Sequence, residues 1–177
     1  KGLTGKLGDG TGKWRLTIAS TLDLSAQSLI RTPDGFLTNL SALVTPNASG
    51  TSTLSFFNPA SNTAQQSFVR LVNSGTESSA VTISGVDDAG QIAPNGDVTL
   101  TLAAGQSIEL SATDLEKGNA DLQLIGSLGD GSGRWRLEVS SDPQISVMSY
   151  VLTSTGFLTN MSEVVGAAST TNTVWIF

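Results

Sequence analysis

The sequence predicts an all-β fold, an antiparallel β-sandwich that repeats about every 121 residues. Three observations carry this prediction. Apolar and polar side chains alternate over short segments, and clusters of Gly, Pro, Asn and Asp separate these segments. In addition, two distant parts of the chain are closely similar to each other, which is typical of repeat proteins.

The internal repeat sets the expected organisation of the chain. Residues Leu3–Val44 align without a gap on Leu124–Val165, and 21 of the 42 aligned positions are identical. Two stretches are most similar, namely Leu7–Leu16 with Leu128–Leu137 and Gly35–Ser41 with Gly156–Ser162. This degree of identity over a fixed offset indicates two copies of one structural unit.

The alignment places both ends of the chain inside a repeat. After a one-residue deletion, residues 51–57 match residues 171–177 at an offset of 120. We therefore expect residues 1–48 to be the C-terminal part of one repeat and residues 49–169 to be a complete β-sandwich repeat. Residues 170–177 are then the first strand of the next repeat, and the chain is a window on a longer tandem array.

Strands are predicted wherever apolar residues recur at every second position. In the segment 134–139, Trp135, Leu137 and Val139 share one face, and charged residues occupy the other. Further inward-facing sets are Leu54 with Phe56, Val69 with Leu71, Val81 with Ile83, Val98 with Leu100 and Leu102, Ile108 with Leu110, and Ile145 with Val147 and Val151. Such a series of short strands with turn residues between them favours an antiparallel β-sandwich.

Large buried side chains should anchor each core. We expect Trp135, Leu137 and Val139 to anchor the complete copy, and Trp14 to anchor the partial one. One short helix per repeat is predicted around Ala112–Lys117, with Ser or Thr available to cap its start and a glycine to end it.

Composition excludes several classes of function. The chain has no Cys and no His, which excludes a disulfide framework, a thiol nucleophile, a zinc ribbon and a Ser-His-Asp triad. Its formal net charge is −6 without a basic cluster, so we expect no nucleic-acid partner. No apolar run is long enough to span a bilayer, and no constellation of base and nucleophile indicates an enzyme.

Calcium is the metal that the loops are best suited to hold. Asp87, Asp88 and Asp130 lie in predicted loops, and calcium prefers carboxylate and carbonyl oxygens. Each loop carries only one or two carboxylates, however, and no EF-hand spacing is present. The segment 87–90 is equally typical of a hairpin turn, so these three residues are candidates for a weak site at most, and we expect no other cofactor.

Two repeated motifs have simpler structural interpretations. The Leu-Gly-Asp-Gly-x-Gly motif lacks a following helix, so a tight glycine turn is favoured over a phosphate loop. In the Gly-Phe-Leu-Thr-Asn motif we expect Phe157 and Leu158 to close one end of the sandwich and Asn160 to bond a loop backbone. Tyr150 and Met148 point away from the core and differ from the earlier copy, which fits contacts between repeats or neutral surface change better than a shared sugar platform.

The motifs together resemble a known group of repeats. They are Phe57–Asn62, Val69–Asn73, Val81–Gly90, Leu128–Leu137 and Gly156–Asn160. As a set they resemble the tandem Ig-like β-sandwich repeats of large secreted and surface proteins of proteobacteria. The resemblance implies an Ig-like fold and an extracellular or cell-surface location, and it implies no catalytic residues.

These observations lead to one expected function and one alternative. The chain is expected to be a non-catalytic structural repeat of an extracellular bacterial stalk, fibre or adhesin. Its partners would be neighbouring repeats or identical chains, which it would contact by repeat-to-repeat and lateral packing. The alternative is a glycan- or surface-binding accessory module of a secreted enzyme or adhesin, with affinity multiplied by repetition.

Overall fold

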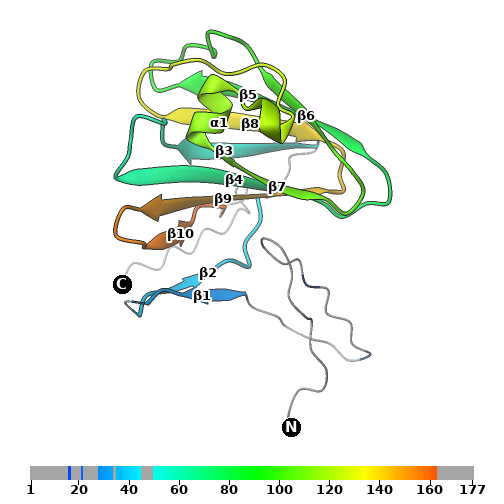
Figure 1. Cartoon of the computed structure of the whole chain (residues 1–177), viewed down its shortest axis with the longest axis vertical. Helices are drawn as coiled ribbons and strands as arrows, with labels where there is room; N and C mark the ends of the chain where they lie inside the picture. The colour runs from blue at the N-terminus through cyan, green and yellow to red at the C-terminus, as the bar shows by residue number, and fades with distance from the viewer. Residues whose placement is uncertain (1–15, 17–20, 22–27, 34, 45–49, 163–177) are drawn as a thin grey trace, which may run out of the picture.

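The computed structural model describes residues 16, 21, 28–33, 35–44 and 50–162. Over these residues the chain consists of antiparallel β-strands, connecting loops and two short helices (Figure 1). The predicted all-β class is therefore confirmed.

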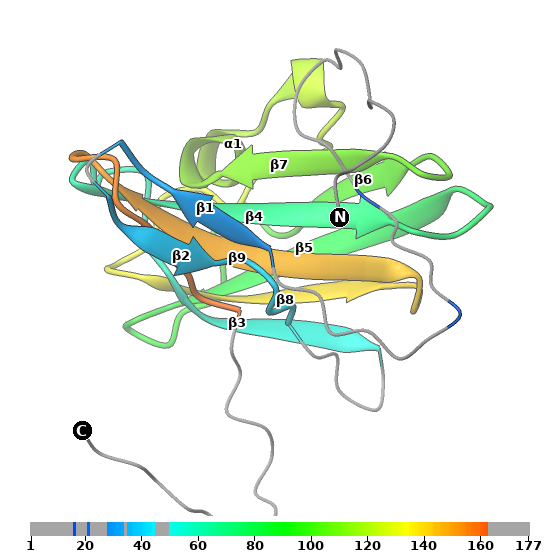
Figure 2. The ribbon, with the colours of Figure 1, turned by 90° about the horizontal axis from the view of Figure 1, so that it is seen from below.

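The strands of the described residues form two four-stranded sheets and one separate hairpin. The first sheet has the order β10-β9-β4-β7, with β4 (Gln65–Asn73), β7 (Ser107–Ser111), β9 (Ile145–Thr153) and β10 (Leu158–Asn160). The second has the order β3-β8-β5-β6, with β3 (Thr51–Phe57), β5 (Ser79–Asp87), β6 (Val98–Leu102) and β8 (Trp135–Ser141). The hairpin consists of β1 (Leu29–Arg31) and β2 (Leu37–Asn39), and it lies beside β9 and β10 (Figure 2).

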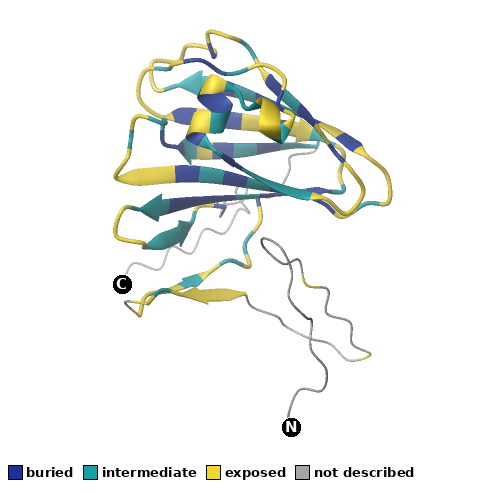
Figure 3. Ribbon diagram, viewed as in Figure 1, coloured by how far each residue is buried: buried dark blue, intermediate teal, exposed yellow. Residues whose placement is uncertain are grey.

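Buried side chains from both four-stranded sheets belong to one hydrophobic cluster (Figure 3). Trp135 is 1% exposed, and Leu137 and Val139 are fully buried, so all three contribute to this core. Strand β8 lies between β3 and β5 in its sheet, and its alternate residues Trp135, Leu137 and Val139 all belong to the cluster. Trp14, the anchor expected for the partial copy, lies outside the described residues.

One predicted inward position is wrong. Leu54 is buried as expected, but the buried aromatic residue of β3 is Phe57 rather than Phe56. The pairing of β3 with β8 shifts register between Leu54 and Phe57, and such a bulge reverses the side on which the following residues lie. Phe56 therefore faces outward, where the Arg134 guanidinium lies 4.9 Å from its ring centroid.

The predicted helix is present as α1 (Ala112–Lys117), followed by a 3₁₀ helix, η1 (Ala120–Leu122). Ser111 caps α1 in a capping box with Asp114, and Gly118 ends it at φ 76°. The helix brings Glu116 into the core, where its Oε1 accepts hydrogen bonds from Trp135 Nε1 at 2.9 Å and from the Ala60 backbone N–H at 3.1 Å. One carboxylate thus connects the helix, β8 and the loop after β3.

The glycine-rich loop before β8 lies over the indole of Trp135. A Cβ added at Gly131 would be 2.5 Å from Trp135 Cζ2, well inside van der Waals contact. Gly133 has φ 83°, and a Cβ there would be 2.6 Å from the Asp88 carboxylate. Glycine is required at both positions because the loop passes too close to its neighbours for a side chain.

We expect Gly131→Ala to lower the free energy of unfolding by about 1–3 kcal/mol, because the methyl group would overlap the six-membered ring of Trp135. Phenylalanine lacks the indole atoms involved, so the penalty should fall to less than about half in a Trp135→Phe background. Urea denaturation of the four proteins of this double-mutant cycle measures both values. An equal penalty in the two backgrounds would contradict the proposed overlap.

Candidate functional site

The β1–β2 hairpin reproduces the β9–β10 hairpin residue for residue. Leu29, Ile30 and Arg31 pair with Asn39, Thr38 and Leu37, in that order. The residues 121 positions later, at the end of β9 and in β10, pair in the same register. The sequence similarity of these segments therefore corresponds to the same strand pairing.

The turns of the two hairpins also share their hydrogen bonds. The backbone N–H of Thr32 donates to the Phe36 carbonyl at 2.9 Å, and that of Thr153 donates to the Phe157 carbonyl at 2.8 Å. The turn glycine lies in the left-handed region in both, with φ 92° in the first hairpin and 85° in the second. Local sequence thus determines the same turn twice, although the two hairpins have different surroundings.

The Asn-x-Ser segment after each hairpin forms a local turn. Asn39 Oδ1 accepts a hydrogen bond from the Ser41 backbone N–H at 2.9 Å, and Asn160 Oδ1 accepts one from the Ser162 N–H, also at 2.9 Å. This Asx-type turn explains why the Asn-x-Ser pattern recurs in both copies.

The two hairpins contact each other through polar groups of the repeated motif. Asn160 Nδ2 donates to the Asn39 carbonyl at 3.3 Å and to the Ala42 carbonyl at 3.1 Å. The Thr38 hydroxyl donates to the Leu158 carbonyl. Asn160 bonds a backbone as expected, and that backbone lies at the end of the first hairpin and just after it.

Apolar and backbone contacts complete this interface. The rings of Phe36 and Phe157 meet edge to face, with centroids 4.9 Å apart, so Phe157 packs on its counterpart in the other copy. The Val44 N–H donates to the Val147 carbonyl at 2.8 Å and forms an isolated bridge on β9. Residues 39–44, which leave the first hairpin, are therefore held against strands β9 and β10.

Tyr150 lies beneath the first hairpin rather than on an open surface. It is 6% exposed and stacks on Phe68 with ring centroids 5.2 Å apart and an interplanar angle of 16°. Burial raises the pKa of Tyr150 above its ordinary value, and a hydrogen bond to Glu109 raises it further. The aromatic pair is thus part of an internal contact, which leaves no open sugar platform at these two residues.

Two of the three calcium candidates hold loops together by accepting backbone hydrogen bonds. Asp87 Oδ2 accepts from the Ser132 N–H at 2.8 Å, and its Oδ1 accepts from the Gln91 N–H at 2.8 Å. Asp88 Oδ2 accepts from the Arg134 N–H at 2.9 Å. These carboxylates connect the turn after β5 to the glycine-rich loop before β8.

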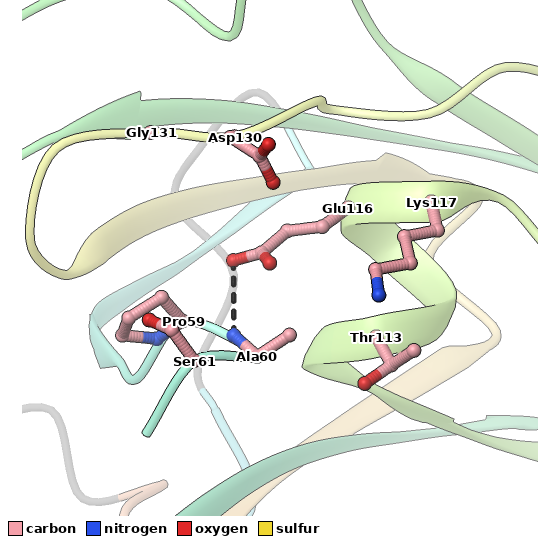
Figure 4. A pocket seen from close by; sticks show the side chains of 8 residues that line it. All are labelled: Pro59, Ala60, Ser61, Thr113, Glu116, Lys117, Asp130 and Gly131. Carbon is pink, nitrogen blue, oxygen red and sulfur yellow. Dashed lines mark hydrogen bonds between the residues drawn. The ribbon is translucent and has the colours of Figure 1, made fainter. Parts of the chain in front are cut away.

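Asp130 lies elsewhere, in a pocket of about 380 Å³ (Figure 4). Glu116 and Lys117 also line this pocket, and one Glu116 oxygen already serves Trp135 and Ala60. Within the described part of the chain, no three His, Cys, Asp or Glu side chains are grouped so that they could hold one metal ion. The structure therefore does not bring Asp87, Asp88 and Asp130 together as one ligand set.

Comparisons with known proteins give no family for this chain. No family model matches it, and no curated protein matches it. Among solved structures, a protein described as Anabaena sensory rhodopsin transducer aligns with a TM-score of 0.44 and 14% sequence identity. That alignment covers 59% of this chain and 98% of the other.

The sequence pattern did not predict several contacts between residues that are far apart in the chain. The bonds from Asn160 span 121 and 118 residues, and the bond from Trp135 to Glu116 spans 19. The identity of Asn39 and Asn160 was a visible signal, but it did not show which copy would supply the partner. Glu116 is one of two acidic residues in the predicted helix, and nothing in the sequence pattern distinguishes it as the buried one.

We expect Asn160→Ala to increase amide hydrogen exchange at Val44 several-fold, because the side chain that holds the 39–42 backbone would be lost. Asn39→Ala is the matched control. It removes the same local bond to a serine N–H, but no bond from the Asn39 side chain to the other copy is present in the described residues. Equal exchange at Val44 in both variants would show that the hydrogen bonds from Asn160 do not hold residues 39–44 in place.

Asp87 should make stability depend on pH. Backbone hydrogen bonds, first from Ser132 and then from Gln91, lower the pKa of Asp87 below 3.8. A lowered carboxyl pKa stabilises the fold above the unfolded-state pKa, and this contribution is lost as the pH falls through the lower folded value. Urea melts between about pH 5 and pH 2 should therefore show a steeper loss for the native chain than for Asp87→Asn. Parallel pH profiles would contradict this role.

Proposed function

We propose that the chain is a segment of a tandem array of Ig-like β-sandwich repeats and serves as a non-catalytic structural part of an extracellular bacterial stalk, fibre or adhesin. The observation that carries this proposal is the attachment of residues 39–44 to the complete copy. Asn160 bonds the Asn39 and Ala42 carbonyls, and Val44 bonds Val147 on β9. A connection that is itself hydrogen-bonded to the following unit gives a defined joint rather than a free tether.

Two further observations support a repeat architecture. The hairpins 121 residues apart have the same register and the same turn bonds, so one unit recurs with its local geometry preserved. The two four-stranded sheets share one hydrophobic cluster, which is the arrangement expected of an Ig-like sandwich. In such arrays each unit contacts its neighbours, and the sum of many small joints gives length and stiffness.

The polar chemistry of the chain suits a passive role outside the cell. With no Cys and no His, its charge and covalent structure do not respond to redox state or to mild changes of pH. Asp87 and Asp88 are used to hold loops, and Glu116 is used to hold Trp135. The described residues contain no helix of the length and apolarity that a bilayer crossing requires.

Negative-stain electron microscopy of the parent protein, purified from its natural source, tests this proposal. We expect elongated particles or filaments with a regular repeat along their length. A compact particle with no repeating unit would overturn the structural role.

Addition of millimolar calcium should change the melting temperature by no more than a few degrees, because the loop carboxylates already accept backbone bonds.

A further inference from the structure

Two loop segments that are far apart in the sequence lie directly against each other. The turn 94–97 connects β5 to β6, and the segment 126–129 lies between η1 and β8. The Asn95 backbone N–H donates to the Leu128 carbonyl at 3.2 Å. A Cβ added at Gly129 would lie 2.9 Å from Asn95 Cγ, so the two segments are packed without room for a further carbon atom between them.

The turn contains the most reactive asparagine that the sequence offers. Asn95 is followed by Gly96, and no other asparagine of the chain precedes a glycine. The backbone nitrogen that follows an asparagine can attack the side-chain amide carbon, and a glycine places no side chain in the way of this attack. Asn95 is also exposed, so water reaches its side chain.

Two hydrogen bonds hold the reacting atoms in the folded chain. Asn95 Nδ2 donates to Ser127 Oγ at 2.9 Å, which directs the amide toward the neighbouring segment. The Gly96 N–H donates to the Ala93 carbonyl at 3.1 Å, which engages the nitrogen that would attack. Ring formation needs the Asn95 side chain to turn toward the Gly96 nitrogen and this nitrogen to lose its proton. It therefore competes with both hydrogen bonds.

We propose that Asn95 is a site of spontaneous modification, and that the bond to the Ser127 hydroxyl sets its rate in the folded chain. The Gly96 nitrogen loses its proton and bonds to Asn95 Cγ, while the Cγ–Nδ2 bond breaks and Nδ2 leaves as ammonia with that proton. Water then opens the cyclic imide at either carbonyl and gives aspartate or isoaspartate at this position. The substrate is the chain itself, and water is the co-reactant.

The two products differ in their effect on the packed segments. Aspartate keeps the length of the backbone, and the Ser127 hydroxyl can donate to its carboxylate because a hydroxyl both donates and accepts. Isoaspartate adds the side-chain methylene to the main chain of a turn that already contacts Gly129. We therefore expect a lower urea midpoint for the isoaspartate form, and a midpoint close to that of the native chain for Asn95→Asp.

Incubation of the whole chain in mildly alkaline buffer, followed by peptide mass spectrometry, measures the conversion of the Asn95 amide to an acid. We expect Ser127→Ala to increase the rate several-fold and Ser127→Thr, which keeps a hydroxyl, to leave it unchanged. Ser132→Ala is the matched control, since it lies in the glycine-rich loop that follows and bonds Asp87 through its backbone N–H. Circular dichroism checks that each variant is folded.

The chain denatured in urea supplies the rate without any restraint from the fold, and this comparison needs no substitution. We expect conversion at Asn95 to be several-fold faster there than in the folded native chain. Equal rates in the folded and denatured chains would overturn the restraint, and so would equal rates in Ser127→Ala and Ser132→Ala.

Absence of the product from the denatured chain would overturn the modification site itself. These measurements concern only the turn 94–97 and its neighbouring segment, so their outcome is independent of the proposed tandem array and of the microscopy that tests it.

Discussion

A single buried carboxylate connects helix α1, strand β8 and the loop after β3. Glu116 is 6% exposed, and an unpartnered carboxylate at such a site would cost several kcal/mol. Its Oε1 accepts from the indole of Trp135 and from the backbone of Ala60, which offsets that cost only when helix α1, strand β8 and the loop after β3 are all in place. The glycine-rich loop passes close over the indole at Gly131, so the position in which Glu116 holds the ring also limits where this loop can lie.

The two hairpins show which features are determined by local sequence and which by tertiary packing. Their registers, turn glycines and Asx turns are the same, because each feature is determined within about fifteen residues of sequence. Their packing is different, because burial depends on what lies opposite. Val151 is buried on the inner face of β9, whereas its equivalent, Ile30, lies on an outer face and is 41% exposed. The same sequence pattern thus specifies a hairpin but does not specify its partner.

The same division explains how much of the structure could be predicted from sequence. The all-β class, the helix at residues 112–117 with its serine cap, and the burial of Trp135 all follow from patterns local to a few residues. The bulge that buries Phe57 in place of Phe56 depends on how β3 pairs with β8. The alternation of apolar and polar residues along one strand does not encode that pairing. The sequence shows Asp87 and Asp88 as loop carboxylates. It does not show that they accept hydrogen bonds from a second loop more than forty residues away.

The repeated asparagine is where local and tertiary requirements meet. Its Oδ1 accepts a backbone hydrogen bond within its own turn in both copies, and an aspartate could do the same. At Asn160 the Nδ2 group also donates to two carbonyls of the other copy, which an aspartate could not do, because its oxygens are acceptors and its charge would face two carbonyl dipoles. An amide is therefore required once the turn also serves as a joint. A hairpin that kept only this turn would tolerate Asp at the position, whereas one whose side chain also donates to the backbone of a second hairpin requires Asn.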